Sequence, residues 1–313
     1  MQYPTISEYV KASQDASDNL DMFTEATAEE LNEAIIGEFG VKYSKDGRKL
    51  LKAPKNFDGT YSIKEGTQII CDRAFIGCKS LRSIVIPDSV TSIGNRAFYG
   101  CWFLCSLVIP DSVTSIGDWA FGDCLSLSSI VIPESVVNLN GNPFCRWNGE
   151  LKCLSPYFIY DNKVLFNKDK SKIIAFRDKK AKSYAIPDYV TSIGDSAFKC
   201  CESLRSIVIP DSVTSIGYWA FRDCSSLTDI AIPDSVTSIG NNAFKFCFSL
   251  RSIIIPDGVT SIGNNAFGWC ESLSSLVIPE GVTSIGESAF FGCNFPNDLK
   301  QELSSRFGDK IFW

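Results

Sequence analysis

Thiols are the side chains of this 313-residue chain with the most scope for chemistry, because it has thirteen cysteines and eight of them recur at a regular spacing. Stacked units would place successive thiols about 5 Å apart, near the Cα separation of a disulfide, but a linear column offers no tetrahedral pocket for zinc. We interpret the column as small buried apolar groups and predict no metal site. The column is Cys78, Cys101, Cys124, Cys201, Cys224, Cys247, Cys270 and Cys293, with Trp147 taking the fourth turn.

Five cysteines lie outside the column, and the odd total leaves at least one thiol unpaired in a monomer. Cys105 falls where Arg82 lies in the first repeat, which predicts an exposed, reactive thiol. The vicinal Cys200 and Cys201 should point apart, since adjacent side chains diverge. The five are Cys71, Cys105, Cys145, Cys153 and Cys200.

Carboxylates form a second column, because an acidic residue follows the proline of eight Ile-Pro steps. Like charges about 5 Å apart would attract cations. No D-x-[DN]-x-[DN]-G loop is present, however, and aspartate after proline is a common turn residue, so we interpret the column as turns. Its members are Asp88, Asp111, Glu134, Asp188, Asp211, Asp234, Asp257 and Glu280.

The missing residue types and motifs argue against catalysis. The chain has no histidine, which excludes Ser-His-Asp and Cys-His catalysis and H-E-x-x-H zinc sites. It also lacks phosphate-loop, dinucleotide and nucleophile-elbow motifs. A net charge of −6 argues against nucleic-acid binding, and the lack of any run of about 18 apolar residues argues against membrane insertion. We predict a protein that is not an enzyme and takes no cofactor.

A 23-residue repeat positions all these residues. Each unit reads approximately L-x-S-I-V-I-P-D-S-V-T-S-I-G-x-x-A-F-x-x-C-x-S. Fixed apolar positions at a fixed period mean that each unit buries its apolar face against its neighbours. We predict a strand over 81–86, a turn at Pro87, a corner at Gly94 and an interior filled by Phe98 and Cys101. The matching phenylalanines are Phe75, Phe98, Phe121, Phe144, Phe198, Phe221, Phe244, Phe267 and Phe290.

A longer echo indicates an internal duplication, because residues 41–51 match residues 164–174 at an offset of 123. Both copies have a β-hairpin pattern. We therefore divide the chain into an N-terminal helical cap segment (1–40), a solenoid (41–293) and a C-terminal capping helix and tail (294–313). The hairpin insertions lie near 41–62 and 148–185.

The ends of the solenoid need covers, since a terminal coil would expose apolar surface and strand edges. Thr27 and Glu30 form a capping-box pattern, which predicts a short helix with Leu31, Ile35 and Ile36 on its apolar face. At the other end, Asn297 is the expected N-cap of a helix over 298–307 that Gly308 terminates.

The unit Ile-Pro-Asp-x-Val-Thr-x-Ile-Gly-x-x-Ala-Phe-x-x-Cys, over about 41–293, resembles the BspA-like class of leucine-rich repeats. The Tyr43-Ser-Lys-Asp-Gly segment and the end at 298–307 also look like family features. The resemblance implies a solenoid with strands on its inner face and a protein-binding role; secreted members are associated with bacterial adhesion to host matrix proteins. We predict a right-handed, β-rich leucine-rich repeat horseshoe or arc of about nine 23-residue coils, with β-hairpin insertions and short α-helical caps.

The outward positions of the repeated strand are the first candidates for partner binding, because their side chains are small and uniform. A solvent-facing valine row suits an extended partner that contacts many coils weakly. The alternative is that duplication copied a neutral surface whose β-branched residues only favour the strand. The candidates here are Arg82, Arg205, Arg251, Ser83, Val85, Ser206, Val208, Asp229, Ser252 and Ile254.

Aromatic residues in the variable positions of the repeat are the second candidates. Phe246 and Phe248 flank Cys247, and Trp269 falls one coil after Phe246. Trp119 and Trp219 share another position, immediately before an alanine. Clustered surface aromatics are typical binding anchors, and the alternative is that these rings pack between coils.

We expect a monomeric scaffold that binds a protein partner of unknown identity through its extended faces. The alternative is an exported cell-surface adhesin or carbohydrate-binding repeat protein whose leader is absent from this chain. Residues 1–11 have neither a basic segment nor an apolar segment typical of a leader. We therefore expect a cytoplasmic protein, or a cell-surface or secreted one if a leader was removed.

Overall fold

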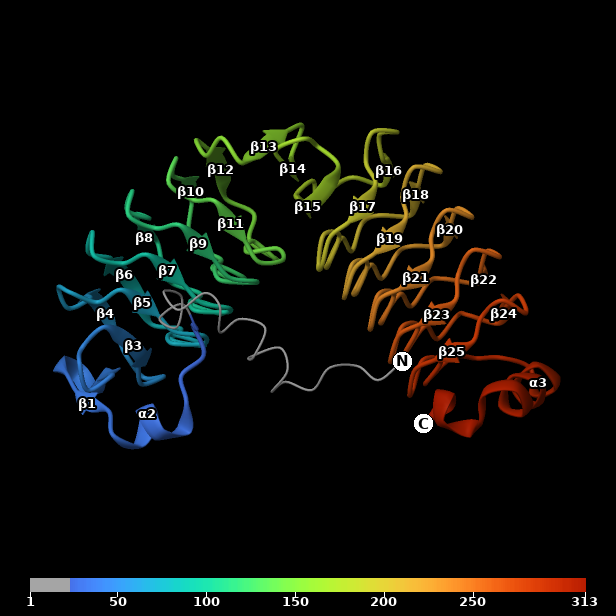
Figure 1. Ribbon diagram of the computed structural model, residues 1–313, viewed down its shortest axis with the longest axis horizontal. Coiled ribbons are helices and arrows are strands. Elements are labelled where there is room, and N and C mark those ends of the chain that lie inside the picture. The colour runs from blue at the N-terminus through green and yellow to red at the C-terminus, as the bar shows by residue number, and fades with distance from the viewer. Residues whose placement is uncertain (1–22) are drawn as a thin grey trace, which may run out of the picture.

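Each repeat unit folds into one coil of a solenoid, because its apolar residues face the interior at every corner. In the first complete unit Ile84 is buried while Val85, its neighbour in the strand, is exposed. The Val90 amide then donates to the Pro87 carbonyl at 3.0 Å, which closes the turn to a shorter second strand. The computed structural model describes residues 23–313 and contains about ten coils of about 23 residues, arranged as an open arc (Figure 1).

One strand of each coil lies on the outer side of the arc, and we call these the outer strands (Figure 1). They pair in parallel, in four separate sheets. The sheets are β4 (Gly59–Ser62), β6 (Leu81–Val85) and β8 (Ser106–Leu107); β10 (Ser129–Ile132) and β12 (Glu150–Cys153); β16 (Ser183–Ala185), β18 (Ser206–Val208) and β20 (Asp229–Ala231); and β22 (Ser252–Ile254) and β24 (Ser275–Val277).

The second strand of each coil lies nearer the inside of the arc, and these inner strands form two continuous sheets. Each sheet starts with antiparallel strands and continues in parallel. The first contains β1 (Ile35–Ile36), β2 (Lys42–Tyr43), β3 (Lys49–Lys52), β5 (Ile69–Ile70), β7 (Ser92–Ile93), β9 (Ser115–Ile116) and β11 (Asn138–Leu139). The second contains β13 (Phe158–Asp161), β14 (Val164–Asn167), β15 (Lys172–Phe176), β17 (Ser192–Ile193), β19 (Ser215–Ile216), β21 (Ser238–Ile239), β23 (Ser261–Ile262) and β25 (Ser284–Ile285).

The repeated Ser–Val strands lie on the outside of the bend, so the inner-face placement that the family resemblance implied is wrong for them. Coils spread apart on the outer side of a bend, and the strand ladder needs a spacing of about 4.8 Å. The outer ladder accordingly breaks between β8 and β10 and between β20 and β22, while the inner ladder is unbroken within each half. Ile230, which points inward from an outer strand, is 8% exposed, whereas Val236 on the inner side of the same coil is 0% exposed.

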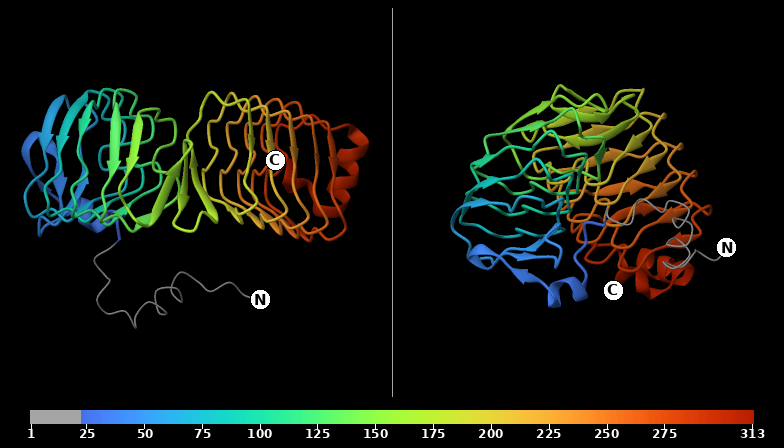
Figure 2. Two further views of the ribbon diagram at one scale, coloured as in Figure 1. Left: turned by 90° about the horizontal axis from the view of Figure 1, so that it is seen from above. Right: turned by 60° about the vertical axis from the view of Figure 1, so that its left-hand side comes forward.

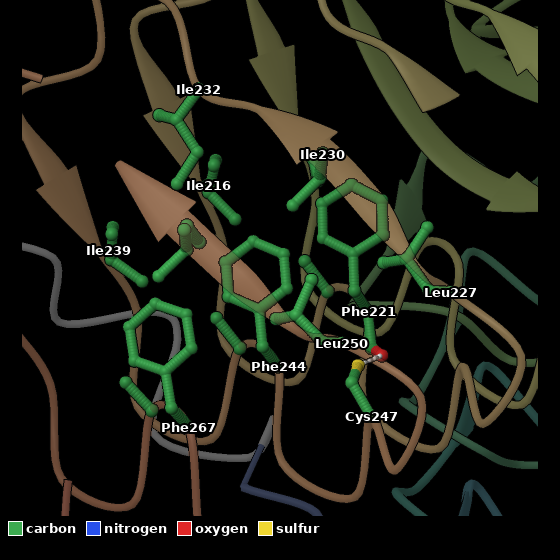
Figure 3. Close-up of a cluster of buried hydrophobic side chains, with 14 of the residues drawn as sticks. Ile216, Phe221, Leu227, Ile230, Ile232, Ile239, Phe244, Cys247, Leu250 and Phe267 are labelled. Atoms are coloured by element: carbon green, nitrogen blue, oxygen red, sulfur yellow. Dashed lines mark hydrogen bonds between the residues drawn. The ribbon is translucent and has the colours of Figure 1, made fainter. Parts of the chain in front are cut away.

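Phenylalanine and cysteine fill the interior in continuous columns, as the repeat predicted. The rings of Phe221, Phe244 and Phe267 stack at 5.2 Å between successive centroids (Figure 3). The Cys247 thiol donates to the Phe221 carbonyl of the preceding coil at 3.3 Å. All thirteen cysteines are free, so the interpretation of the column as buried thiols is confirmed. The same bond to the preceding phenylalanine is made by Cys101, Cys124, Cys224, Cys270 and Cys293.

Trp147 takes the place of the cysteine in the fourth turn, as expected. Its side chain is 1% exposed, and its indole Nε1 donates to the Leu127 carbonyl at 2.6 Å. Cys105 is exposed and Cys153 is half-buried, while the other eleven thiols are buried. Cys200 and Cys201 diverge into two different apolar clusters, as predicted.

A β-hairpin formed by β14 and β15 lies between the two halves of the solenoid (Figures 1 and 2). Its two faces belong to two different hydrophobic cores. The face toward the second half carries Val164, Phe166, Ile173 and Phe176. The face toward the first half carries Leu165, Ile174 and Ala175. The predicted joint is thus an apolar wedge that both halves bury.

The hairpin of β2 and β3 is the structural copy of this wedge at the start of the first half, which confirms the predicted duplication. Both hairpins shift register at the same place, between Lys42 and Tyr43 and, 123 residues later, between Leu165 and Phe166. In the first copy, Leu51 packs against the segment that contains the N-terminal helix. Its counterpart in the second copy, Ile174, packs against the first half.

The N-terminal cover agrees with the prediction in part. Helix α2 (Ala28–Asn32) starts with the expected capping box, in which the Glu30 amide donates to Thr27 Oγ1 at 3.1 Å and the Thr27 amide donates to Glu30 Oε2 at 2.8 Å. The prediction that Ile35 and Ile36 belong to this helix is wrong, because they form β1 and pair with β2. A 3₁₀ helix follows at Glu38–Gly40. The part of the predicted cap at 1–22 lies outside the described residues.

Helix α3 (Asn297–Phe307) covers the last coil. Asn297 is not its N-cap as predicted, because Pro296 occupies that position and its carbonyl already accepts the Lys300 amide. Gly308 ends the helix with a φ of 79°, as expected. A 3₁₀ helix at Asp309–Phe312 completes the cover.

Candidate interaction surfaces

The turns that follow the inner strands form the inner edge of the arc (Figure 1). The position just before the column cysteine takes a left-handed backbone in these turns, and glycine occupies it at Gly77, Gly100 and Gly292. Phe246 and Trp269 hold the same position with φ values of 64° and 61°. This backbone costs an L residue about 1 kcal/mol, so these corners carry large rings where glycine would be easier.

One pair of rings lies at each of these two corners, on adjacent coils, and we call the two pairs the aromatic patch: Phe246 with Phe248 and Trp269 with Phe291. The centroids of Phe246 and Phe248 are 5.9 Å apart, and those of Trp269 and Phe291 are 5.0 Å apart. Phe248 is 40% exposed and Trp269 is 39% exposed. The three residues predicted from the sequence therefore lie on adjacent coils, with partly exposed rings.

Two cations border the aromatic patch. The Arg222 guanidinium lies 5.1 Å from the centroid of Phe246, and the Lys245 ammonium lies 5.3 Å from it. Such contacts attract because the face of an aromatic ring is negative. Burial of Lys245 lowers the pKa of its ammonium. The patch thus combines apolar area with positive charge.

The two other predicted aromatic residues lie together at the junction of the halves. The rings of Trp119 and Trp219 are 5.0 Å apart, and Trp119 is only 7% exposed. Trp119 Nε1 donates to Ser196 Oγ of the second half at 3.1 Å. These tryptophans therefore join the halves and are separate from the aromatic patch.

The outer strands carry the predicted β-branched row on the outer surface of the arc. Val85 is 53% exposed, Val208 is 64% exposed and Ile254 is 69% exposed. Their equivalents Val108, Val131 and Val277 are exposed as well. Together they form an apolar row across the coils, which we call the outer row.

The remaining predicted strand residues border the outer row. Ser206 pairs in register with Asp229, and Ser252 holds the same position one coil later. All three are exposed, while Ser83 is half-buried. Arg82, Arg205 and Arg251 are exposed at the starts of their strands. Arg82 Nε lies 3.9 Å from Asp58, an exposed ion pair that adds little stability. The outer strands lie on the opposite side of the arc from the turns that follow the inner strands (Figure 1).

Sequence reasoning missed an exposed apolar group in the first half. Trp102 is 41% exposed, Phe103 is 59% exposed and Leu125 is 64% exposed, and the Lys79 ammonium lies 3.9 Å from the Trp102 ring. Trp102 and Leu125 hold the position after the column cysteine, as Phe248 does. This shared position in the repeat is the sequence feature from which the exposure of Trp102 and Leu125 could have been predicted.

The carboxylates that follow the prolines are all exposed, in keeping with turn residues. Across residues 23–313, no three His, Cys, Asp or Glu side chains are arranged to hold a metal ion. Every helix in that range is too short or too polar to span a bilayer.

The repeat matches one protein-family model, described as the BspA type leucine rich repeat region, in six copies over residues 59–154 and 172–296. Curated proteins give no match.

Solved structures of similar proteins come from several bacteria. A leucine rich cell surface protein from Faecalibacterium prausnitzii is 27% identical, with 83% of this chain and 82% of that chain covered and a TM-score of 0.64. A leucine-rich repeat protein from Eubacterium ventriosum is 21% identical, covering 84% and 94%, with a TM-score of 0.59. The pneumococcal vaccine antigen PcpA is 20% identical, covering 92% and 90%, with a TM-score of 0.60. The similarity to the Eubacterium ventriosum protein and to PcpA shows a shared fold only.

Proposed function

Because this chain belongs to the BspA-type leucine-rich repeat family, we propose that it is a monomeric, non-enzymatic scaffold that binds a partner protein through the aromatic patch. Proteins of this family are generally interaction or surface scaffolds. The observation that carries the proposal is the presence of partly exposed Phe and Trp rings at corners where the backbone favours glycine.

The chemistry of the patch defines the partner surface that it fits. Aromatic and arginine side chains supply most hot spots in protein interfaces. Arg222 and Lys245 beside the rings favour a partner segment that presents carboxylates next to apolar side chains. The absence of histidine from the chain supports the non-enzymatic part of the proposal.

The test compares two sets of substitutions on opposite sides of the coils. Phe246→Ala, Phe248→Ala and Trp269→Ala together should reduce recovery of the partner from native lysate by about tenfold or more. Circular dichroism should show an intact solenoid, since these rings are outside the phenylalanine column. The binding constant of the recovered partner is then measured by calorimetry with both proteins purified.

The matched control acts on the outer row. Val208→Thr, Ile254→Thr and Val277→Thr keep β-branched side chains in the strands while making the row more polar. This variant should recover the partner as well as the unsubstituted protein does. Loss of binding only in the threonine variant would move the site to the outer row, and a folded alanine variant that binds normally would overturn the proposal.

A cytoplasmic location is part of the same proposal, supported by thirteen unpaired thiols. The second candidate is a cell-surface scaffold, which the name of the Faecalibacterium prausnitzii protein favours. Fractionation of the source cells with an antibody to this chain separates the two. Protection from added protease in intact cells is expected for the cytoplasmic protein, and digestion for the surface protein.

A further inference from the structure

The two halves of the solenoid form a cavity of about 430 Å³, open to solvent, where their inner turns meet. Its walls come from both halves, and they include Arg96, Trp119 and Arg146 from the first and Lys199, Trp219 and Arg222 from the second. The volume falls within the range of about 300–1,000 Å³ that is typical of small-molecule sites. The cavity adjoins the aromatic patch through Arg222, which lines the cavity and lies 5.1 Å from the centroid of Phe246.

Positive charge in this cavity exceeds the negative charge available to balance it. Arg146 pairs with Asp123 at 3.2 Å, and Arg222 pairs with Asp223 at 3.3 Å. Asp223 also accepts a weak hydrogen bond from the Cys200 thiol at 3.7 Å.

The two remaining cations, Arg96 and Lys199, have no carboxylate at ion-pair distance anywhere in residues 23–313. Asp118 acts on both cations at longer range, so the cavity holds two positive charges whose carboxylates lie beyond ion-pair distance.

Lys199 makes this imbalance costly. Its side chain is 5% exposed, and its ammonium lies 3.2 Å from the centroid of Trp119, which the Arg96 guanidinium approaches to 4.6 Å. Burial lowers the pKa of the Lys199 ammonium, because a desolvated charge is disfavoured. A buried ammonium is costly unless an opposite charge or hydrogen bonds compensate it. Contact with an aromatic face compensates only part of that cost.

A buried hydrogen-bond donor that lacks an acceptor also favours an anionic ligand in this cavity. Trp219 Nε1 is buried and has no hydrogen-bond partner, although the equivalent nitrogen of Trp119 donates to Ser196. Arg222 Nε makes no hydrogen bond either, but it already faces the Asp223 carboxylate at 3.3 Å. Unmet buried donors are rare in folded proteins, since each costs about 1–3 kcal/mol. The wall thus offers cations and donors, and an oxygen-rich anion is the complementary group.

We propose that this junction cavity binds an oxyanion, with Arg96 and Lys199 supplying the unpaired charge and the Trp219 indole donating a hydrogen bond. A phosphate or a carboxylate meets these requirements, because both accept several charge-assisted hydrogen bonds. The cavity also has room for a flat group attached to the anion, which the rings of Trp119 and Trp219 would contact.

The experiment titrates the whole protein with three probes: inorganic phosphate, phenyl phosphate and benzoate. Binding is followed by calorimetry and by the fluorescence of the tryptophans. Phosphate binding without benzoate binding identifies a phosphate site, and the reverse identifies a carboxylate site. Tighter binding of phenyl phosphate than of inorganic phosphate shows that the rings contribute. The affinity should fall as salt rises, as expected for charged ligands.

Two substitutions with matched controls locate the site. Lys199→Met should weaken binding about tenfold or more, whereas Lys182→Met, at an exposed position outside the cavity and the aromatic patch, should change it less than about twofold. Arg96→Met should act like Lys199→Met, with Arg73→Met one coil earlier as its control. If Lys199→Met does not fold, Arg96→Met and its control Arg73→Met still test the site, because Arg96 is only half-buried and its replacement should leave the fold intact.

Two outcomes would overturn the inference. The first is a folded, unsubstituted protein that gives neither heat nor a fluorescence change with any of the three probes at millimolar concentration. The second is binding that Arg96→Met and a folded Lys199→Met leave unchanged.

Discussion

The indole rings of Trp119 and Trp219 lie 5.0 Å apart although they belong to different halves of the solenoid. Ser196 reinforces this contact, because its hydroxyl accepts from Trp119 Nε1 at 3.1 Å and its carbonyl accepts from Asn142 Nδ2 at 2.9 Å. The hairpin wedge lies between the two hydrophobic cores, and these side chains join the halves at their inner turns. The two features together fix the angle between the halves.

Trp119→Ala should lower the free energy of unfolding by about 3–5 kcal/mol, the usual cost of removing a buried tryptophan. The substitution removes the ring contact and the hydrogen bond to Ser196. Urea unfolding followed by circular dichroism measures the effect. We expect one transition for the unsubstituted protein and two for the variant, because the two cores lose a shared contact. Trp102→Ala, at a 41% exposed position, is the control and should cost less than about 1 kcal/mol.

Gly240→Ala should destabilise the protein by about 1–3 kcal/mol through overpacking. A methyl group there would lie 2.7 Å from the Gly217 carbonyl carbon of the preceding coil. Close approach to the preceding coil therefore explains this repeated glycine, whereas the sequence predicts a corner at Gly94. Gly268→Ala is the control, since its nearest contact would be 3.4 Å. Equal melting temperatures for the two variants would contradict this explanation.

Asp118 should make stability depend on pH. Its burial raises the pKa of the carboxyl to about 7, with Asp195 adding to the rise and the Asn142 amide, Arg96 and Lys199 opposing it. The folded state therefore holds the proton more tightly than the unfolded state. The stabilisation from that proton is complete below about pH 4 and is lost as the pH rises to about 7.

The measurement is urea unfolding across this pH range for the unsubstituted protein and for Asp118→Asn. The difference between the two free energies should change with pH in the stated direction, because asparagine does not titrate. Asp88→Asn, at an exposed turn position, should retain the pH dependence, because Asp88 is not among the groups that act on Asp118. A difference that stays constant from pH 4 to about pH 7 would show that Asp118 keeps an ordinary pKa.

Cys105 should be the first thiol that reacts with iodoacetamide in the folded protein. Its side chain is exposed, whereas each column thiol is buried. Peptide mass spectrometry after brief treatment should find one modified site, and Cys105→Ser should remove it. Unfolding in urea should expose all thirteen thiols as the control. Modification of Cys247 at a comparable rate would mean that the coils open readily.

The repeat was enough to predict the columns of the core, because each position in the unit has one environment in nearly every coil. Phe176 was missed since it precedes Phe198 by 22 residues, one fewer than the period. The structure nevertheless stacks their rings at 5.0 Å, so the hairpin supplies a tenth phenylalanine to the column.

Contacts between the halves could not be predicted in the same way. Arg96, Lys199 and Trp219 occupy variable positions, and the repeat does not specify which coils meet at the junction. These residues come close because the hairpin of β14 and β15 sets how the two halves face each other, and this arrangement appears only in the folded chain. The placement of Ile35 and Ile36 was missed for a related reason, because strand pairing with β2 decided it and the local helical pattern did not.

The two copies of the hairpin show how a protein of this kind lengthens. On the face toward the preceding element, Lys42 and Lys52 of the first copy correspond to Leu165 and Ala175 of the second, which are buried against the first half. Leu51 and Ile174 are covered by the α2 segment in one case and by finished coils in the other. A starting cap becomes an internal connector once such lysines are replaced by apolar residues. Tandem copying of one hairpin together with its coils then extends the molecule without a new terminal structure. The number of such copies determines how far the chain curves toward a closed ring.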